Sequence, residues 1–240
     1  MNYSKLISKG SQHKVFCEDF MIDEQLNGKF KIFGVFDGCS SGKDSHFASS
    51  LLGKTVISAA KKVDFEQSVN PLKEIVYQAI RSYKEIQNSL KLDVNEMLST
   101  MILMLLNTET NIAEIIAIGD GLVSVNQEIT NIDQLNQPDY PAYHFDEIEN
   151  YNDFEDFYTK QLIFSNIKVE DITISTDGIN SYLIKGQNES QEIDVIEYFT
   201  KDSFLNGNPA MLARKHNILK NKHRLENGDD IAIIRITNFE

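Results

Sequence analysis

The chain of 240 residues is poor in cysteine, with only Cys17 and Cys39. Two cysteines cannot form the disulfide framework of a small secreted domain, so we expect two reduced thiols in a reducing compartment. No apolar stretch approaches the length needed to cross a bilayer, and the first ten residues lack the apolar core of a signal peptide. The sequence therefore predicts a cytoplasmic protein with no membrane partner.

Basic residues are also scarce, because 23 Lys and Arg stand against 36 Asp and Glu, which gives a formal net charge of −13. This balance argues against a nucleic-acid partner, and it leaves basic protein partners and bound cations open. None of the five histidines has the spacing of a zinc site, and the chain has no Gly-rich phosphate loop. A zinc protein and a doubly wound nucleotide-binding fold are therefore both disfavoured.

Apolar residues make up 41% of the chain, enough for one sizeable core, and no shift in composition marks a second domain. We predict a single domain over residues 1–240 and expect a monomer. The order of periodic segments favours an α+β protein. The expected segments are strands within 3–36, helices at 47–63 and 70–90, strands at 100–106, 112–118 and 122–125, a strand pair at 162–165 and 169–176, helices at 179–185, 193–200 and 209–222, and a last strand at 231–236.

Two groups of these segments carry further expectations. The three strands between residues 100 and 125 are joined by short turns, which predicts an antiparallel meander. The first two helices each have a stripe of apolar residues at three- and four-residue intervals. The stripe of the first helix begins at Phe47, and that of the second ends at Leu90. Both stripes are predicted to face the core.

Two charged segments are interpreted as solvated. Residues 133–156 contain no Lys or Arg, many acids, Pro138 and Pro141, which predicts an acidic loop or flap within about 127–160. The last predicted helix carries a basic stretch that indicates a solvated face, formed by Lys215, Lys220, Lys222 and Arg224.

Acidic residues stand at the ends of four separate β-like runs. Taken alone, an Asp-Gly pair predicts no more than a tight hairpin turn. Carboxylates that converge from separate strands instead form the hard-oxygen environment that Mg²⁺ or Mn²⁺ selects. The four corners are Asp37-Gly38, Gly119-Asp120-Gly121, Asp177-Gly178 and Gly228-Asp229-Asp230.

A fifth acidic pair, Glu18-Asp19, interrupts the apolar frame of residues 15–22. A buried strand does not tolerate two acids without a partner, so the residues alone predict that the pair lies at an exposed strand edge.

These motifs, together with Ser99-Thr100, occur in the order and rough spacing of the motifs of the metal-dependent serine/threonine phosphatases of the protein phosphatase 2C type. No single motif is specific, but six in order over almost the whole chain are, and the chain resembles this family. A bacterial member is expected. The resemblance implies a four-layer α-β-β-α sandwich, with two antiparallel sheets packed face to face and a pair of helices outside each.

The resemblance also implies an activity, the removal of phosphate from phosphoserine or phosphothreonine proteins by a hydroxide that bridges two Mg²⁺ or Mn²⁺ ions. Such ions neutralise the phosphate and lower the pKa of the attacking water from ~15.7 toward neutrality. The implied roles are Asp37 as the bridge, the Gly38 carbonyl as an oxygen ligand, Asp177 and Asp229 as ligands of one metal, Glu18 and Asp19 as holders of bound water, and Lys14 as the residue that binds phosphate.

Three positions depart from the family pattern. Lys14 replaces the usual Arg, and Lys offers one point charge where Arg offers a planar fork. Cys39 stands where many relatives have a His that would protonate the leaving group. Ser181 replaces an Asp of an additional metal site near Asp120, so we expect two metals per chain.

The alternative function is that of a pseudophosphatase, which keeps the sandwich and binds phosphoproteins or a regulatory partner without turnover. Lys14 favours it slightly, whereas the retained Asp37, Asp177 and Asp229 favour the enzyme. A metal-dependent hydrolase of another phosphate ester also stays open.

Overall fold

The computed structural model describes residues 2–135, 137–184 and 193–237, and its strands form two five-stranded sheets and one short pair. The first sheet, in spatial order, contains β1 (Asn2–Ser8), β12 (Ile231–Thr237), β9 (Asp171–Ser175), β6 (Gly121–Val125) and β7 (Glu128–Ile132). The second contains β2 (Phe20–Gln25), β3 (Phe30–Phe36), β4 (Met101–Asn107), β5 (Ile112–Ile118) and β8 (Leu162–Lys168). The short pair is β10 (Tyr182–Ile184) with β11 (Leu225–Asn227).

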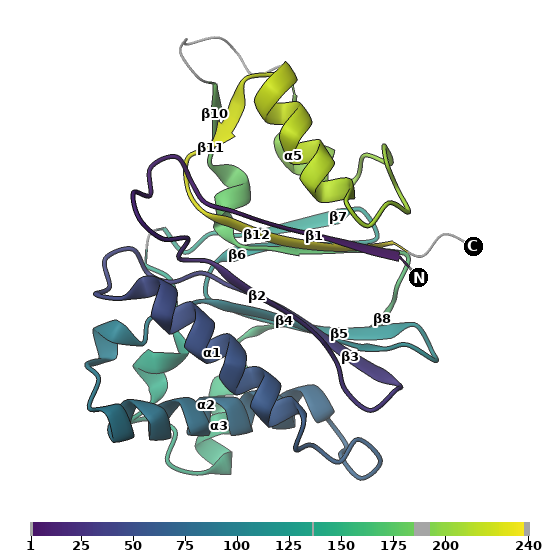
Figure 1. The fold of residues 1–240 in the computed structure, drawn as a ribbon. Helices are drawn as coiled ribbons and strands as arrows, with labels where there is room; N and C mark the ends of the chain where they lie inside the picture. The colour runs from purple at the N-terminus through teal and green to yellow at the C-terminus, as the bar shows by residue number, and fades with distance from the viewer. Residues whose placement is uncertain (1, 136, 185–192, 238–240) are drawn as a thin grey trace.

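All neighbouring strands within the two large sheets run antiparallel, and the sheets pack face to face with helices on both outer sides (Figure 1). Outside the second sheet lie α1 (Ser45–Ala60), α2 (Pro71–Leu90) and α3 (Tyr151–Tyr158). Outside the first sheet lie α4 (Val195–Thr200) and α5 (Met211–Lys222). Three single 3-10 turns connect these elements: η1 (Val94–Glu96), η2 (Pro141–His144) and η3 (Asp177–Asn180).

Alternation along the strands creates the layers, because successive side chains point to opposite faces of a sheet. In β3, Phe33 and Val35 enter the cluster between the sheets, whereas Ile32 and Phe36 enter the cluster under α1 and α2. In the same way, the even-numbered apolar residues of β12 face the other sheet and Ile231 and Ile233 face α4 and α5. The predicted α+β fold with two antiparallel sheets and outer helices is confirmed.

The predicted meander is wrong, and so is the strand pair after it. β4 and β5 are neighbours in the second sheet, but β6 lies in the first sheet between β7 and β9. Likewise β8 pairs with β5 whereas β9 pairs with β12 and β6, so β8 and β9 belong to different sheets. In each case the short connection crosses from one sheet to the other. The local residues of such a crossing resemble those of a hairpin turn, so they do not distinguish the two.

The acidic segment is not a solvated loop, because it contains η2 and α3. Side chains such as Tyr140, Phe145 and Phe154 are at most 5% exposed and belong to the core cluster under α1 and α2. The acids occupy the outer side of this segment, and Asn150 caps α3 by accepting hydrogen bonds from the backbone N–H groups of Asn152 and Asp153.

Three smaller predictions also fail. The expected helix at 179–185 is η3 followed by β10, and Lys185 lies outside the described residues. Phe47 is 37% exposed and Leu90 is 57% exposed, so neither belongs to the buried stripe of its helix.

Lys215 is not on a solvated face, because its side chain is fully buried. Its ammonium donates to the carbonyl oxygens of Tyr198 and Asp202, each at 2.7 Å, and lies 3.0 Å from the Asp202 carboxylate. Burial lowers the pKa of this lysine, and the pairing with Asp202 opposes that effect. The contact fixes α5 to the end of α4.

Among the residues that the structure describes, no helix combines the length and the apolar character needed to cross a bilayer.

Candidate metal and phosphate site

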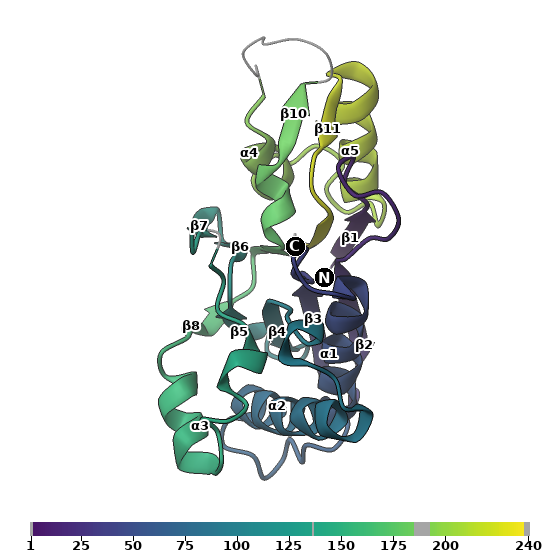
Figure 2. The same cartoon turned by 90° about the vertical axis from the view of Figure 1, so that its left-hand side faces the viewer.

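The four acidic corners lie on loops at the end of the sandwich where α1 and β12 begin, the end that faces the viewer in Figure 2. Asp37 directly follows β3, and Asp120 lies where the chain crosses from β5 to β6. Asp177 opens η3 after β9, and Asp229 lies two residues before β12. Both sheets therefore contribute acids to one end of the molecule.

Hydrogen bonds with the start of β4 fix Asp37 and Gly38. The Thr100 backbone N–H donates to the Asp37 carbonyl oxygen at 2.8 Å, and the Thr100 hydroxyl accepts from the Asp37 N–H at 3.3 Å. Gly38 forms a bridge with Ser99, and a Cβ atom on Gly38 would lie 2.1 Å from the Ser45 carbonyl oxygen. Only glycine therefore allows α1 to begin this close to the acidic corner.

Asp19 is buried, with 4% of its surface exposed, so the exposed strand edge predicted for it is wrong. One carboxylate oxygen of Asp19, Oδ2, accepts from the Thr176 hydroxyl at 2.7 Å. Burial raises the pKa of Asp19 well above its usual range, and the charges of Asp230 and Asp177 add to this effect, so negative charge is crowded at this point.

Ser181, which replaces the usual Asp, joins two of the corners. Its hydroxyl donates to the Gly178 carbonyl oxygen at 2.7 Å and accepts from the Asp229 backbone N–H at 3.0 Å. A Cβ on Gly178 would lie 1.7 Å from the Asp230 carbonyl oxygen, so glycine is required there as well. This connection holds the loop of Asp177 against the loop of Asp229.

Asp230 anchors the loop between β1 and β2. Its carboxylate accepts from the backbone N–H of Gly10 at 2.6 Å and from that of Glu18, and Nδ1 of His13 lies 3.0 Å from its Oδ2 atom. The other ring nitrogen of His13 lies 3.0 Å from Oδ1 of Asp229. The Nδ1 atom of His13 also lies 3.7 Å from Glu18 Oε2. The sequence around His13 does not predict its contacts with Asp229 and Asp230, because these two residues lie more than 200 positions away.

The acids raise one another's pKa values. Burial, then Asp120 and Asp229, raises the pKa of Asp177 to about 7. Burial and the charges of Asp19, Asp177 and Asp229 raise the pKa of Asp37 well above its usual range. Burial likewise raises the pKa of Asp120, with contributions from Asp133 and Asp229. These carboxylates therefore form one electrostatic group.

Comparison with known proteins identifies the family. The family model described as protein phosphatase 2C matches residues 9–214. The chain belongs to the protein phosphatase 2C family. A comparison with curated proteins finds no match.

Several proteins of known structure share the fold of this family member. The serine/threonine phosphatase Stp1 from Staphylococcus aureus has 11% identity and a TM-score of 0.63, over 99% of this chain and 95% of that one. The S. agalactiae serine/threonine phosphatase has 11% identity and a TM-score of 0.60, over 99% of each chain. RsbX in complex with magnesium has 15% identity and a TM-score of 0.57, over 96% of this chain and 92% of that one.

The donor set of this phosphatase 2C chain fits a hard divalent cation. Buried oxygens without a hydrogen-bond partner in the described residues include Glu18 Oε2, Asp19 Oδ1 and Asp120 Oδ1. Such oxygens are the ligands that Mg²⁺ and Mn²⁺ prefer. Within the described part of the chain, however, no three acidic, His or Cys side chains are grouped closely enough to hold one ion.

Two further residues belong to the edge of the site. Lys14 is exposed on the loop that Asp230 anchors, and its carbonyl oxygen accepts from Lys9 Nζ at 3.3 Å. Cys39 is partly buried next to Gly38; burial raises its pKa, but hydrogen bonds with Ser41 and Tyr140 outweigh this and lower it. Tyr140, whose pKa is raised by burial and by the nearby Cys39, Asp37 and Asp120, lies next to the site.

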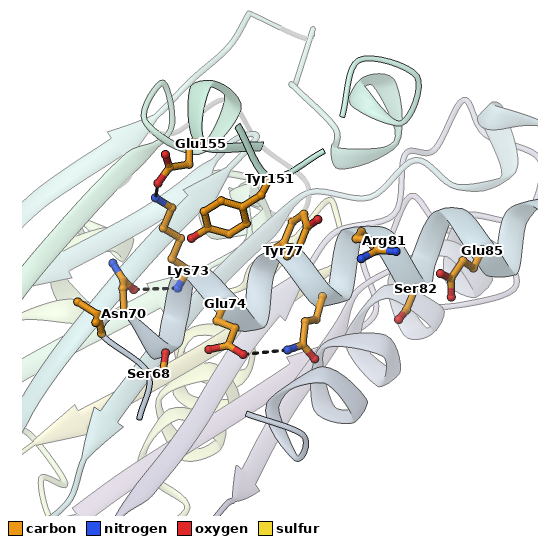
Figure 3. A pocket seen from close by; sticks show the side chains of 12 residues that line it. Ser68, Asn70, Lys73, Glu74, Tyr77, Arg81, Ser82, Glu85, Tyr151 and Glu155 are labelled. Atoms are coloured by element: carbon orange, nitrogen blue, oxygen red, sulfur yellow. Dashed lines mark hydrogen bonds and ion pairs between the residues drawn. The ribbon is translucent and has the colours of Figure 1, made fainter. Parts of the chain in front are cut away.

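A groove of about 780 Å³ lies away from the acidic corners, on the outer side of α2 (Figure 3). α3 contributes Tyr151 and Glu155, and Glu155 pairs with Lys73 across the groove. The cations of the lining, Lys73 and Arg81, stand among three glutamates, so the groove has no excess positive charge for a phosphate. The acidic end of the sandwich is therefore the candidate site.

Proposed function

We propose that the chain is a Mg²⁺- or Mn²⁺-dependent phosphomonoesterase that removes phosphate from phosphoserine and phosphothreonine proteins in the cytoplasm. The observation that carries this proposal is the convergence of acids from both sheets at one end of the sandwich. Burial raises the pKa of Asp19, Asp37, Asp120 and Asp177 together. Such crowding destabilises a fold unless a cation offsets it, and family membership supports the same conclusion.

Each acid has a distinct part in this proposal. Asp37 would contact two metals, with the Gly38 carbonyl oxygen beside it, and Asp177 and Asp229 would hold one of them. When bound, the cations neutralise the phosphate dianion and lower the pKa of the attacking water. Glu18 and Asp19 orient water. We expect two metals per chain, because Ser181 supplies a hydroxyl where a further carboxylate would be needed beside Asp120.

Lys14 completes the site by holding the substrate phosphate through a charge-assisted hydrogen bond. Lys14 is exposed, and other groups hold its loop: the Lys14 carbonyl oxygen accepts from Lys9 Nζ, and the Glu18 N–H donates to Asp230. With Cys39 in place of the His of many relatives, water is expected to protonate the leaving alkoxide.

A pseudophosphatase is the second candidate, favoured by Lys14 in place of the family's Arg. The Mn²⁺ dependence of hydrolysis of a phosphothreonine peptide distinguishes the two. Activity that rises with Mn²⁺ and is lost in Asp177→Asn supports the enzyme. No hydrolysis at any Mn²⁺ concentration, with retained binding of the phosphopeptide, supports the pseudophosphatase.

A further inference from the structure

Three exposed apolar side chains lie at the edge of the acidic site. Val15 is 71% exposed, Phe16 is 55% exposed and Phe47 is 37% exposed. Val15 and Phe16 directly follow Lys14 on the loop before β2, and Phe47 is in the first turn of α1. We call these three residues the apolar rim. Exposed aromatic and β-branched side chains gathered beside a site are a feature of binding surfaces.

The apolar rim is held in place. The ring of Phe16 stacks on the ring of His46, with centroids 4.2 Å apart and an interplanar angle of 21°. The Glu18 carbonyl oxygen accepts from the Ser49 hydroxyl at 2.5 Å and from the Gly38 N–H at 3.2 Å. The loop that carries Phe16 is therefore fixed to the first turns of α1 at Phe16 and at Glu18, and a fixed aromatic ring binds a ligand with little loss of entropy.

The same contacts place the rim next to the proposed chemistry. Gly38 is packed against Ser45, which neighbours His46 in sequence, and Gly38 directly follows Asp37. Phe16 lies two residues after Lys14 and two residues before Glu18. Two residues of the rim thus follow the residue proposed to hold phosphate, and the third lies in the helix turn that is packed against Gly38.

We propose that the apolar rim is a specificity subsite, which receives an apolar or aromatic side chain within two residues of the phosphorylated residue in the substrate. This inference rests on the proposed function. A phosphorylated segment bound at Lys14 in extended form advances about 3.3 Å per residue, so only its nearest neighbours reach the rim. The acidic corners disfavour an acidic neighbour, and burial of apolar surface at the rim favours an apolar one.

The test measures kcat/KM in Mn²⁺ for phosphothreonine peptides that differ at one flanking position, from two residues before to two residues after the phosphothreonine. Leu, Phe, Ser or Asp is placed at each position in turn. At one position at least, we expect Leu or Phe to raise kcat/KM about fivefold to tenfold over Ser, through partial burial of one side chain. Phe16→Ser should bring this ratio close to one, and Phe16→Leu should largely keep it.

Phe204 provides the matched control, because it is 52% exposed and lies in the loop before α5. Phe204→Ser should keep the full ratio, and melting temperatures verify that all variants are folded. Equal kcat/KM for Leu, Phe and Ser peptides in the wild type would overturn the inference alone, as would a Phe16→Ser variant that slows every peptide by the same factor. Absence of hydrolysis of all peptides would overturn the proposed function as well.

Discussion

At the scale of single residues, the neighbours Asp229 and Asp230 have opposite environments. The Asp229 side chain is 45% exposed, whereas that of Asp230 is 1% exposed and accepts backbone hydrogen bonds from the loop between β1 and β2. Asp229 is therefore available to a cation, while Asp230 holds the loop that presents Lys14 and Phe16. The Asp-Asp pair in the sequence does not reveal this division, because its partners near residues 10 to 18 are distant in the chain.

Lys14 gives a prediction at this scale. If its ammonium binds the substrate phosphate, Lys14→Ala should lower kcat/KM on a phosphothreonine peptide by about 10- to 150-fold, equivalent to ~1.5 to 3 kcal/mol for a charge-assisted hydrogen bond. The affinity for Mn²⁺, measured by calorimetry, should not change. Lys54→Ala, at an exposed position of α1, is the control. An unaltered kcat/KM in Lys14→Ala would make Lys14 an ordinary surface lysine.

At the scale of elements, the sequence predicts the strands and long helices but not which sheet a strand joins. Gly119-Asp120-Gly121 is a turn by composition, and the choice between a hairpin and a crossing depends on β9, which is about 50 residues later. The prediction of a solvated loop for the acidic segment is wrong for another reason. Acids dominate the composition of this segment, while its apolar residues recur at the spacing of a short helix. The Asp-Gly corners can be predicted because their signal is local, whereas the contacts of Thr176 with Asp19, of Ser181 with Asp229 and of His13 with Asp230 join distant parts of the chain.

The acidic segment after β7 gives a prediction that distinguishes a segment packed on the core from a solvated loop. Phe154 on α3 is fully buried and contacts the rings of Tyr77, Phe157 and Tyr158. Phe154→Ala should lower the free energy of unfolding by about 3 to 5 kcal/mol, because it leaves a cavity under α2. Tyr151→Ala on the same helix, where the side chain is 44% exposed, should cost about 1 kcal/mol or less. A solvated flap would give equally small losses in urea unfolding for both variants.

At the scale of the whole molecule, an excess of negative charge is concentrated at one end of the sandwich, where acids from both sheets lie. The metal-free protein should therefore lose stability as pH rises. The folded-state pKa of Asp177, about 7, lies above its ordinary value of 3.8, so the folded state binds this proton more tightly. The stabilisation is complete below pH 3.8 and is lost as pH rises through 7, and each pH unit between the two pKa values removes at most ~1.4 kcal/mol.

Urea unfolding in a chelator, at several pH values between 4 and 8, measures this effect as the difference between the wild type and Asp177→Asn. The variant keeps the shape of the protonated carboxyl and cannot ionise, so the two proteins should be similarly stable at pH 4. At pH 8 the variant should be the more stable protein. A difference that does not vary with pH would show that Asp177 ionises freely in the folded state.

Divalent cations should reverse this balance, because the proposed ligands join the two sheets. Asp37 follows a strand of the second sheet, whereas Asp177 and Asp229 flank strands of the first, so an ion bound by all three connects the layers. A ligand that binds only the folded state, at 100 times its Kd, adds ~2.7 kcal/mol, or roughly 5 to 10 °C in melting temperature for a chain of this size. Wild-type protein in Mn²⁺ should show this gain.

Asp37→Asn and Asp177→Asn, one from each sheet, should both show a much smaller gain in melting temperature, although neither removes a buried contact with apolar residues. Asp146→Asn removes the same charge from a fully exposed side chain of the acidic segment and should keep the full gain. If Asp37→Asn lost the gain and Asp177→Asn kept it, the ion would be bound by one sheet alone, and the proposed convergence of the three carboxylates on the metals would be wrong.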